Sequence, residues 1–462
     1  MSSTLSPGAD AALPTVGELP RSLKLGWGSG ALGVALLMNG VSGLILFYLV
    51  SVLKLDPFLA GALIFVSKLF DVVTDPLVGY WSDQAHSPRG RRRPFLFWSA
   101  FICAGSFVMI FSTPMFDAQW LTATYVLIAM LIYTLGYTLF NVPYMSMPAE
   151  MTDSYHERSS IHGYRMAFVT TGSFIAGSLM PVLLQRLGRT EWSSYTTIGL
   201  IGGGVILVSM LFCYYATADA RHTRKGGEMP NFAGEFSAMW ANKHFLRLIG
   251  IKLAQLTGVA SVTASMLFFL TNSLQQSFDI LAVFGISTTI VSLIAIPALV
   301  TLSKKVGKRQ GYFVAATANV LYSLSWIWAV PGEPTWYFAV RGAIVGVAFA
   351  GNVIFAMSML TDIIDWDARR TGVRREGVYT SLYSFVEKFS AAFGPLIVGA
   401  ALSIAGFNKE LPPEAAQDPA VSQALLLGVS YLPAVCGVIA IFLLIGYRLT
   451  EEELAKAGPA AS

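Results

Sequence analysis

The sequence predicts an all-α polytopic membrane protein whose 12 transmembrane helices form two six-helix halves. The composition is the first observation behind this prediction. Hydrophobic residues make up 54% of the 462 residues and charged residues only 13%, whereas a soluble globular protein carries about 25% charged residues. The second observation is a set of twelve long apolar runs, and the third is a weak repeat that relates the first six runs to the last six. These features exclude a soluble enzyme and give no reason to expect a nucleic-acid partner.

Each apolar run is long enough to cross the bilayer, which requires about 20 mostly apolar residues. Pro and Gly interrupt many runs, as in transporter helices that bend or pack closely, and the runs lack the period of two that barrel strands show. The stretch before the first run is polar and has no basic region followed by an apolar core, so we expect a tail and not a cleaved signal. In chain order the predicted spans are 24–53, 57–82, 95–116, 119–147, 161–186, 193–218, 244–275, 277–302, 311–331, 334–362, 378–405 and 422–449.

The longest polar connection, residues 218–243, separates an N-terminal half, 1–217, from a C-terminal half, 244–462. Pro76 in the second span and Pro297 in the eighth lie 221 residues apart, and a connection with glycine and several basic residues follows each of them. Two six-span halves related by a weak repeat are typical of the major facilitator architecture.

Basic residues predict the orientation. If the N-terminus is cytoplasmic, 22 of the 31 Lys and Arg residues lie in or beside the tails and the even-numbered connections, and four lie in the outer connections. This bias predicts that both termini are cytoplasmic. We expect an integral protein of a bacterial cytoplasmic (inner) membrane, in contact with its lipids.

Cysteine and histidine spacing argues against metal and redox chemistry. Cys103, Cys213 and Cys436 lie far apart in apolar runs, so the chain has neither a disulfide framework nor a Cys-x-x-Cys pair. The five histidines show no metal-ligand spacing. We therefore expect no cofactor, and the charges inside the spans become the main indication of function.

The second span contains Lys68, Asp71 and Asp75, at intervals of three and four residues. This spacing places them on one face of a helix, about 15 Å from the end of the span and thus near the midplane. A charge there costs at least about 2.5–3.5 kcal/mol, so the face must point into the protein. Two carboxylates one turn apart repel unless a cation or a proton lies between them. A structural ion pair of Lys68 with one aspartate is the alternative, but it leaves the second carboxylate unexplained.

Other spans carry isolated charges. In the eleventh span the adjacent residues Glu387 and Lys388 point in different directions, and Lys388 is the better candidate partner for a carboxylate of the second span. Arg165, near the start of the fifth span, is a candidate functional residue. Arg341 and Lys252 are as compatible with snorkelling to an interface as with a functional role.

A basic segment follows the second span and is predicted to mark topology and to contact anionic lipid. It is also a candidate inner gate, in which its arginines and a nearby aspartate pair with acidic residues of the connection between the tenth and eleventh spans. The candidate gate residues are Asp83, Arg91, Arg92, Arg93, Asp362, Asp365 and Asp367.

Three segments of the chain are distinctive: KLFDVVTDPLVGYWSD, NVPYMSMPAEMTD and MLTDIIDWDARRTGVRREGVYTSLYSFVEKFSAAFGP. With them the chain resembles the glycoside–pentoside–hexuronide:cation symporters of the major facilitator superfamily, typified by the melibiose permease. The similarity covers nearly the whole chain, and its most specific parts are the aspartate motif of the second span and the R-E-G…K element of the eleventh. The related lysolipid-transporting branch shares the second-span pattern, so this motif alone does not choose between sugar and lipid.

The resemblance implies a cation site. Asp71 and Asp75 match two aspartates of the family's second span that bind the coupling cation. Thr138 matches a threonine of the fourth span, and Lys388 matches a lysine of the eleventh. An asparagine and a threonine of the family's site are replaced by Thr74 and Ser384. The coupling ion implied is Na+ or H+, and Asp71 and Asp75 are the metal-binding residues if it is Na+. The threonine in place of asparagine leaves the choice of ion open.

The solute site departs from the family's pattern. Ala35 and Asn141 align with two aspartates of the family, in the first and fourth spans. Met145, one turn after Asn141, and Val353 of the tenth span align with two tryptophans. Only an arginine, matching Arg165, is kept, which argues against an α-galactoside. Two carboxylates are gone while Arg165 and Lys388 remain, with Arg341 as a further candidate. An arginine fork suits a carboxylate, so these residues favour an anionic hexuronide.

We therefore expect a symporter, monomeric by the resemblance, that takes up a sugar-type solute by alternating access. A cation-coupled carrier of lysolipids or other amphiphiles is the alternative, in which the lost polar groups make room for the lipid. An intramembrane prenyl- or glycosyl-transferase is less favoured, since such enzymes typically bind Mg²⁺ and diphosphate at the membrane edge and the aspartate pair here lies at the midplane. A sensor or scaffold would need a soluble domain, for which no segment is long enough.

Overall fold

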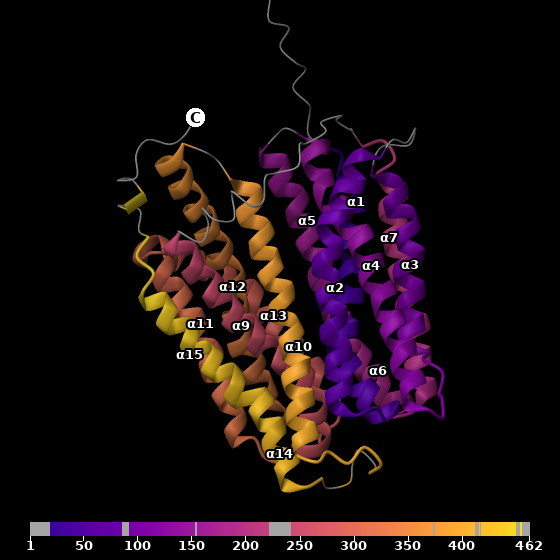
Figure 1. Ribbon diagram of the computed structural model, residues 1–462. Helices are drawn as coiled ribbons and strands as arrows, with labels where there is room; N and C mark the ends of the chain where they lie inside the picture. The colour runs from indigo at the N-terminus through magenta and orange to yellow at the C-terminus, as the bar shows by residue number, and fades with distance from the viewer. Residues whose placement is uncertain are drawn as a thin grey trace, which may run out of the picture.

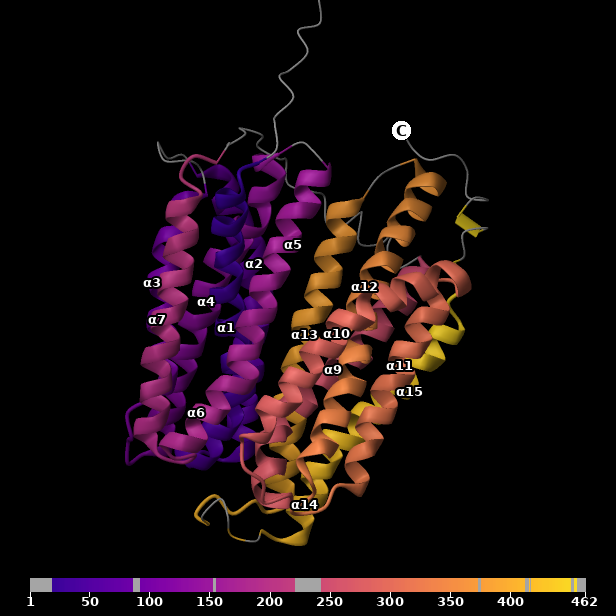
Figure 2. The same ribbon diagram turned by 180° about the vertical axis from the view of Figure 1, so that it is seen from behind.

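The computed structural model describes residues 19–85, 92–152, 155–220, 242–372, 375–411, 415, 417–449 and 453–454. Throughout these residues the regular secondary structure is helical. Figures 1 and 2 show the helices as two bundles side by side, the first indigo to magenta and the second rose to yellow. The predicted all-α fold is confirmed.

The N-terminal half contains the first six predicted spans. Its helices are α1 (Arg21–Phe47), α2 (Pro57–Gln84), α3 (Arg93–Phe111), α4 (Gln119–Met151), α5 (Tyr155–Phe174), α6 (Met180–Leu187) and α7 (Trp192–Ala216). Two π-helical segments extend these columns: η1 (Tyr48–Val52) ends the first span, and η2 (Ile175–Leu179) joins α5 to α6. The connection predicted at 218–243 lies mostly outside the described residues, so the boundary between the halves stays a prediction.

The C-terminal half contains the other six spans. Its helices are α9 (Lys243–Phe268), α10 (Ile280–Val306), α11 (Lys308–Ser325), α12 (Thr335–Thr371), α13 (Glu376–Ile404), α14 (Pro419–Leu426) and α15 (Leu432–Ile445), with the short segments η3 (Phe269–Ser273), η4 (Trp326–Trp328) and η5 (Leu427–Tyr431). In the described part of the chain, 11 helical columns are long and apolar enough to cross a membrane. The twelfth is α11, whose first turn is polar because it holds Lys308, Arg309 and Gln310.

Local sequence explains where several helices begin and end. Asp56 caps α2, since its side chain accepts a hydrogen bond from the Leu59 amide, and Pro57 occupies the first helical position. Asp418 caps α14 in the same way, again followed by a proline. Gly372 ends α12 with φ at 71°, a left-handed conformation that glycine adopts without steric cost. The helix α12 ends nine residues later than predicted. The candidate gate acids therefore lie on a helix and not in a connection.

The backbone repeats with the offset found between the two prolines. The π segments η1 and η3 begin at Tyr48 and Phe269, which are 221 positions apart. Each segment is followed by a non-glycine residue in the left-handed conformation, Lys54 with φ at 56° and Gln275 with φ at 51°, and these are also 221 positions apart. The two halves therefore share a local structure, and the repeat is not confined to sequence.

We call the end of the molecule where α1 begins and α2 ends the inner face, and the opposite end the outer face. The two halves meet mainly along α2 and α13. A Cβ atom on Gly61 would lie 2.6 Å from the carbonyl oxygen of Pro395, so a glycine at this position lets the two helices approach closely. On the other side of the boundary, the Ser178 hydroxyl of η2 donates to the carbonyl of Leu281 at 3.1 Å.

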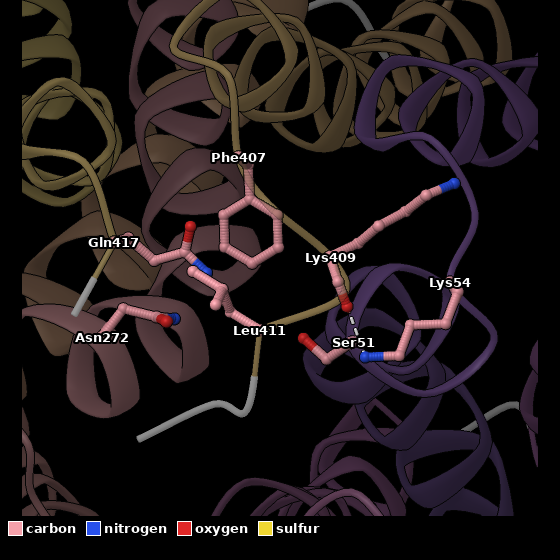
Figure 3. Close-up of a pocket in the computed structure, with 7 residues that line it drawn as sticks. All are labelled: Ser51, Lys54, Asn272, Phe407, Lys409, Leu411 and Gln417. Carbon is pink, nitrogen blue, oxygen red and sulfur yellow. Dashed lines mark hydrogen bonds between the residues drawn. The ribbon is translucent and has the colours of Figure 1, made fainter. Parts of the chain in front are cut away.

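Figure 3 shows where the outer loops of the two halves meet. The ammonium of Lys54 donates to the backbone carbonyl of Lys409. Ser51, Asn272, Phe407 and Gln417 surround this contact, together with Leu411. The contacts that join the halves thus run from the middle of α2 and α13 to the outer face.

Candidate functional site

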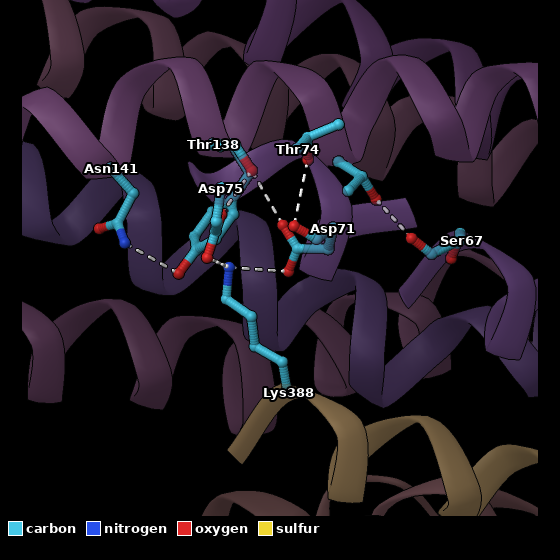
Figure 4. Close-up of polar contacts among 9 residues, drawn as sticks. Ser67, Asp71, Thr74, Asp75, Thr138, Asn141 and Lys388 are labelled. Carbon is cyan, nitrogen blue, oxygen red and sulfur yellow. Dashed lines mark hydrogen bonds and ion pairs between the residues drawn. The ribbon is translucent and has the colours of Figure 1, made fainter. Parts of the chain in front are cut away.

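The ammonium of Lys388, on α13, lies between two carboxylates of α2 (Figure 4). Its Nζ atom is 3.1 Å from Asp71 Oδ2 and donates a hydrogen bond to Asp75. The Thr138 hydroxyl, on α4, is 2.9 Å from Asp71 Oδ1 and 3.1 Å from Asp75 Oδ1. The four side chains come from three helices and from both halves of the molecule.

Helix geometry produces this convergence. Asp71 and Asp75 are one turn apart on α2, so both face the crossing with α4 and α13. Thr138 faces the same crossing from α4, where Thr134, one turn earlier, reaches the backbone oxygen of Ser67 at 3.4 Å. Asp71 is 2% exposed, whereas the Asp75 side chain is 29% exposed. The site is therefore closed around Asp71 and accessible from the side of Asp75.

The other two residues predicted for this site lie next to it with different orientations. The Thr74 hydroxyl donates to the backbone oxygen of Asp71 at 3.1 Å, within its own helix. Ser384, one turn before Lys388, is exposed on α13. Lys68 is buried and lies over the ring of Tyr133, 5.5 Å from its centre. The second aspartate is thus explained by Lys388 and not by Lys68.

Two carboxyl side chains and one ammonium meet at the crossing of α2, α4 and α13, with the buried Lys68 one turn away on α2. Carboxylate and hydroxyl oxygens suit a hard cation, and a proton would relieve the repulsion equally well. Among the described residues, no three His, Cys, Asp or Glu side chains are grouped as they would be around a resident metal.

Tyr137 connects this site to the residues predicted for the solute. Its ring centre is 5.3 Å from Lys388 Nζ, and its hydroxyl accepts a hydrogen bond from Asn141 at 3.1 Å. Arg165 lies partly buried on α5, which packs against α1. Tyr137 is not among the residues predicted for the site, and its position next to Thr138 inside a span was the available signal.

Three apolar residues were predicted to stand where the family's solute site has an aspartate and two tryptophans. Met145 on α4 and Val353 on α12 are exposed to about two-fifths of their surface. Ala35 is 5% exposed, because α1 packs closely on α5 there and a Cβ on Gly172 would lie 2.9 Å from the Ala35 methyl group. Ala35 therefore presents almost no surface to a solute in this conformation.

Arg341, the further candidate for the solute site, is paired within the C-terminal half in this conformation. The guanidinium forms two hydrogen bonds with Glu333, one of them at 3.1 Å, and a third with the Ser325 carbonyl at 3.2 Å. It also lies over the Trp326 ring, 4.3 Å from its centre, and is 5% exposed. A guanidinium enclosed in this way near the outer end of α12 stabilises the C-terminal half and has no free surface for a solute.

The predicted inner gate stays a prediction, because part of it lies outside the described residues. Arg92 pairs with Glu150 at 3.3 Å, and Arg93 donates to the Tyr214 carbonyl at 3.1 Å. The acids of α12 pair with basic residues of their own half, since the ion pairs observed are Asp362–Lys308, Asp365–Arg369 and Asp367–Arg375. The Asp83 side chain and Arg91 lie outside the described residues.

Comparison with known proteins agrees with this geometry. A sequence model of the family described as MFS/sugar transport protein matches residues 26–451. The chain belongs to this family. It is therefore a transporter and not an enzyme, it is integral to a membrane, and the resemblance to the glycoside–pentoside–hexuronide:cation symporters is confirmed.

Several relatives are similar along most of their length. The chain is 26% identical to the uncharacterized symporter YnaJ of Bacillus subtilis over 438 residues, which cover 93% of this chain and 92% of that protein. It is 25% identical to the putative glycoside/cation symporter YagG of Escherichia coli, with 85% and 84% covered. It is 26% identical to the putative sulfoquinovose importer of Escherichia coli, with 94% and 91% covered.

Solved structures share the fold. The crystal structure of the nucleoside transporter NupG superposes with a TM-score of 0.64 at 14% sequence identity, and the match covers 93% of this chain and 100% of that one. At this identity the similarity establishes the arrangement of the helices and nothing about the solute.

Proposed function

We propose that this transporter couples the inward movement of Na+ or H+ to the uptake of an anionic sugar, with a hexuronide as the favoured class. Both termini are cytoplasmic in this proposal, so that the inner face is the cytoplasmic one and the chain works by alternating access. The observation that carries the proposal is the ion pair across the halves, in which Lys388 of α13 lies between Asp71 and Asp75 of α2.

The coupling ion and Lys388 compete for the same carboxylates. When a cation or proton neutralises Asp71 and Asp75, the ammonium loses its partners, and the contact between the halves at this depth changes. An ion that alters this contact must also alter the affinity for a solute bound between the halves, and the solute must alter ion affinity by the same factor. This reciprocity is the thermodynamic basis of symport.

Arg165 supports an anionic solute. Its guanidinium is suited to bidentate hydrogen bonding with a carboxylate or a sulfonate. The positions where a neutral galactoside would find carboxylates hold Ala35 and Asn141. One relative with an overall similarity to this chain is named for the import of sulfoquinovose, a sugar with a sulfonate group.

Asp75→Cys tests the cation site. It removes the more accessible carboxylate, so ion-driven accumulation is expected to be lost while exchange of solute down its gradient continues. The measurement is uptake and counterflow in proteoliposomes, with and without sodium and with and without a pH gradient. Sodium- or proton-driven accumulation that survives in this variant would refute the assigned site.

Counterflow across a panel of solutes tests the solute class. The panel contains glucuronides, pentosides, neutral glycosides and lysolipids, and we expect glucuronides to exchange fastest. Accumulation of a neutral glycoside without competition from any glucuronide would exclude the anionic solute. Exchange of lysolipids alone would favour the carrier of amphiphiles instead.

A further inference from the structure

A second ion pair lies at the depth of the cation site, entirely within the C-terminal half. Lys252 Nζ on α9 is 3.4 Å from Glu387 Oε1 on α13 and 5.2 Å from the centre of the Tyr383 ring. Glu387 precedes Lys388 in the chain, so the two ion pairs share one level in the membrane. The coupling scheme above uses Lys388 and leaves Glu387 without a role.

The two partners differ in exposure. The Lys252 side chain is 7% exposed, whereas the Glu387 side chain is 44% exposed. A carboxylate exposed to lipid at this depth would cost at least about 2.5–3.5 kcal/mol. This cost is avoided if the exposed part of Glu387 faces the interior between the helices, where the buried ammonium of Lys252 balances its charge.

The periodicity of α13 shows where Glu387 points. Successive residues turn by about 100°, so Thr380, Ser384 and Glu387 lie along one edge of the helix, and Thr380 and Ser384 are exposed. Phe385 and Phe389 lie on a different side, where their rings stack with centres 5.6 Å apart. The polar edge adjoins the side from which Lys388 reaches α2, so it opens on the boundary between the halves.

We propose that Glu387, positioned by Lys252, binds the solute and accepts hydrogen bonds from its hydroxyl groups. An ionised carboxylate has two oxygens and only acceptor sites, and Lys252 faces Oε1, which leaves Oε2 for the solute. This inference rests on the proposed function. Arg165 of the N-terminal half holds the acidic group of the sugar, and Glu387 of the C-terminal half holds its hydroxyls.

This placement gives the solute a role in closing the carrier. A sugar held by Arg165 at one end and Glu387 at the other connects the two halves, because α5 and α13 belong to different bundles (Figures 1 and 2). It also supplies a carboxylate to the proposed solute site, whose positions Ala35 and Asn141 carry none.

Glu387→Gln provides the test, with methyl β-D-glucuronide and its monodeoxy analogues as probes at saturating coupling ion. Loss of a hydrogen bond to a charged group predicts binding weakened by about 10- to 100-fold. One deoxy analogue should bind wild-type protein more weakly than the parent sugar but bind the variant as well as the parent does. Equal affinity of wild type and variant for every probe would overturn the proposal.

A paired variant separates solute binding from packing. If Glu387 only neutralises Lys252, the double variant Lys252→Met with Glu387→Gln removes both charges and should restore the affinity for the glucuronide. If Glu387 binds the solute, the double variant stays weak. Ion binding, followed by the ion-dependent change in tryptophan fluorescence, should be the same in Glu387→Gln as in wild type, since Asp71 and Asp75 are untouched.

The solutes that the wild-type protein transports distinguish failure of this inference from failure of the proposed function. A wild-type protein that moves only a neutral sugar removes the anionic solute of the proposed function, and deoxy analogues of that sugar then test Glu387 in the same way. A wild-type protein that moves lysolipids and no sugar overturns both. Wild-type transport of glucuronides with no hydroxyl preference that depends on Glu387 overturns this inference alone.

Discussion

Thr138 places a single hydroxyl within hydrogen-bonding distance of Asp71 and Asp75. One hydroxyl carries one proton, so it donates to one carboxylate at a time while its oxygen lone pairs remain available. A cation that displaces Lys388 would find these lone pairs beside the two carboxylates. In the proposed cycle the hydroxyl is a donor in the ion-free site and a ligand in the ion-bound site.

Thr138→Val tests this role, since it removes the hydroxyl and keeps the shape. We expect the affinity for the coupling ion to fall about 10- to 100-fold, the range for a hydrogen bond with a charged partner. The measurement is ion titration of the purified protein by fluorescence or calorimetry. Thr134→Val is the matched control, because the Thr134 hydroxyl contacts the Ser67 backbone and neither carboxylate. Equal effects of the two substitutions would show that Thr138 has no specific role at the ion site.

Residues that the structure brings together were predictable when the helix period fixed their direction. Asp71 and Asp75 had to share a face of α2, and the cost of burying them required a partner, which was correctly sought in Lys388. Arg341 could not be assigned in this way. Its partner Glu333 lies in the turn before α12, and nothing in the spacing of the two residues shows that Trp326 and Phe338 enclose the guanidinium.

At the scale of elements, the contact between α2 and α13 positions the ion pair. The close approach depends on Gly61, whose missing side chain makes room for the Pro395 carbonyl. Because Lys388 is only seven residues before Pro395 on α13, a displacement at the glycine is expected to move the ammonium as well.

Gly61→Ala is therefore expected to lower the thermal unfolding temperature by several degrees and to weaken ion-coupled uptake, because the new Cβ meets backbone that cannot rotate away. Fluorescence-detected unfolding and proteoliposome uptake measure the two effects. Gly204→Ala on α7 is the matched control, since a Cβ atom there would have no atom of another residue within 4 Å beyond its own helix turn. There alanine should be neutral or stabilising by about 0.5–1 kcal/mol through its helix propensity. An unfolding temperature of Gly61→Ala at or above that of Gly204→Ala would contradict the close-packing argument.

Span positions followed from the apolar runs, and the structure keeps all of them. The ends of the helices were less predictable. The π segments η1 and η3 contain no glycine or proline that would have predicted them. The helix α12 extends beyond its apolar stretch because the ion pairs of its last turns stabilise a polar helix end. Such interactions depend on neighbouring helices, so the sequence of one segment alone does not predict where its helix ends.

At the scale of the whole molecule, alternating access requires the outer contacts between the halves to separate in each cycle. Ser178 of η2 and Gly285 of α10 report on this motion. The Ser178 Cβ lies 3.3 Å from the position of a Cβ on Gly285, close to the range of about 3.5–4.5 Å found in disulfides.

The double variant Ser178→Cys with Gly285→Cys is expected to form a disulfide on mild oxidation and to stop uptake, with recovery after reduction. Radiolabelled uptake before and after oxidation measures this. Ser178→Cys alone is the control, and the native cysteines are all buried. Full uptake by the cross-linked protein would show that the halves do not separate at this point.

The repeat of 221 residues gives both halves the same backbone devices, yet the positions equivalent to Asp71 and Asp75 are Ser292 and Ile296. The repeat therefore does not supply a second aspartate pair at these two positions, and the proposed cycle moves one ion with each solute. One ion per solute means that a tenfold ion gradient, worth about 1.4 kcal/mol, supports at most about tenfold accumulation. A membrane potential adds about 2.3 kcal/mol per charge for each 100 mV, but only if the cycle moves net charge. With a singly charged anion as the solute, one cation makes the cycle electroneutral, and the carrier then accumulates its sugar by the chemical gradient alone.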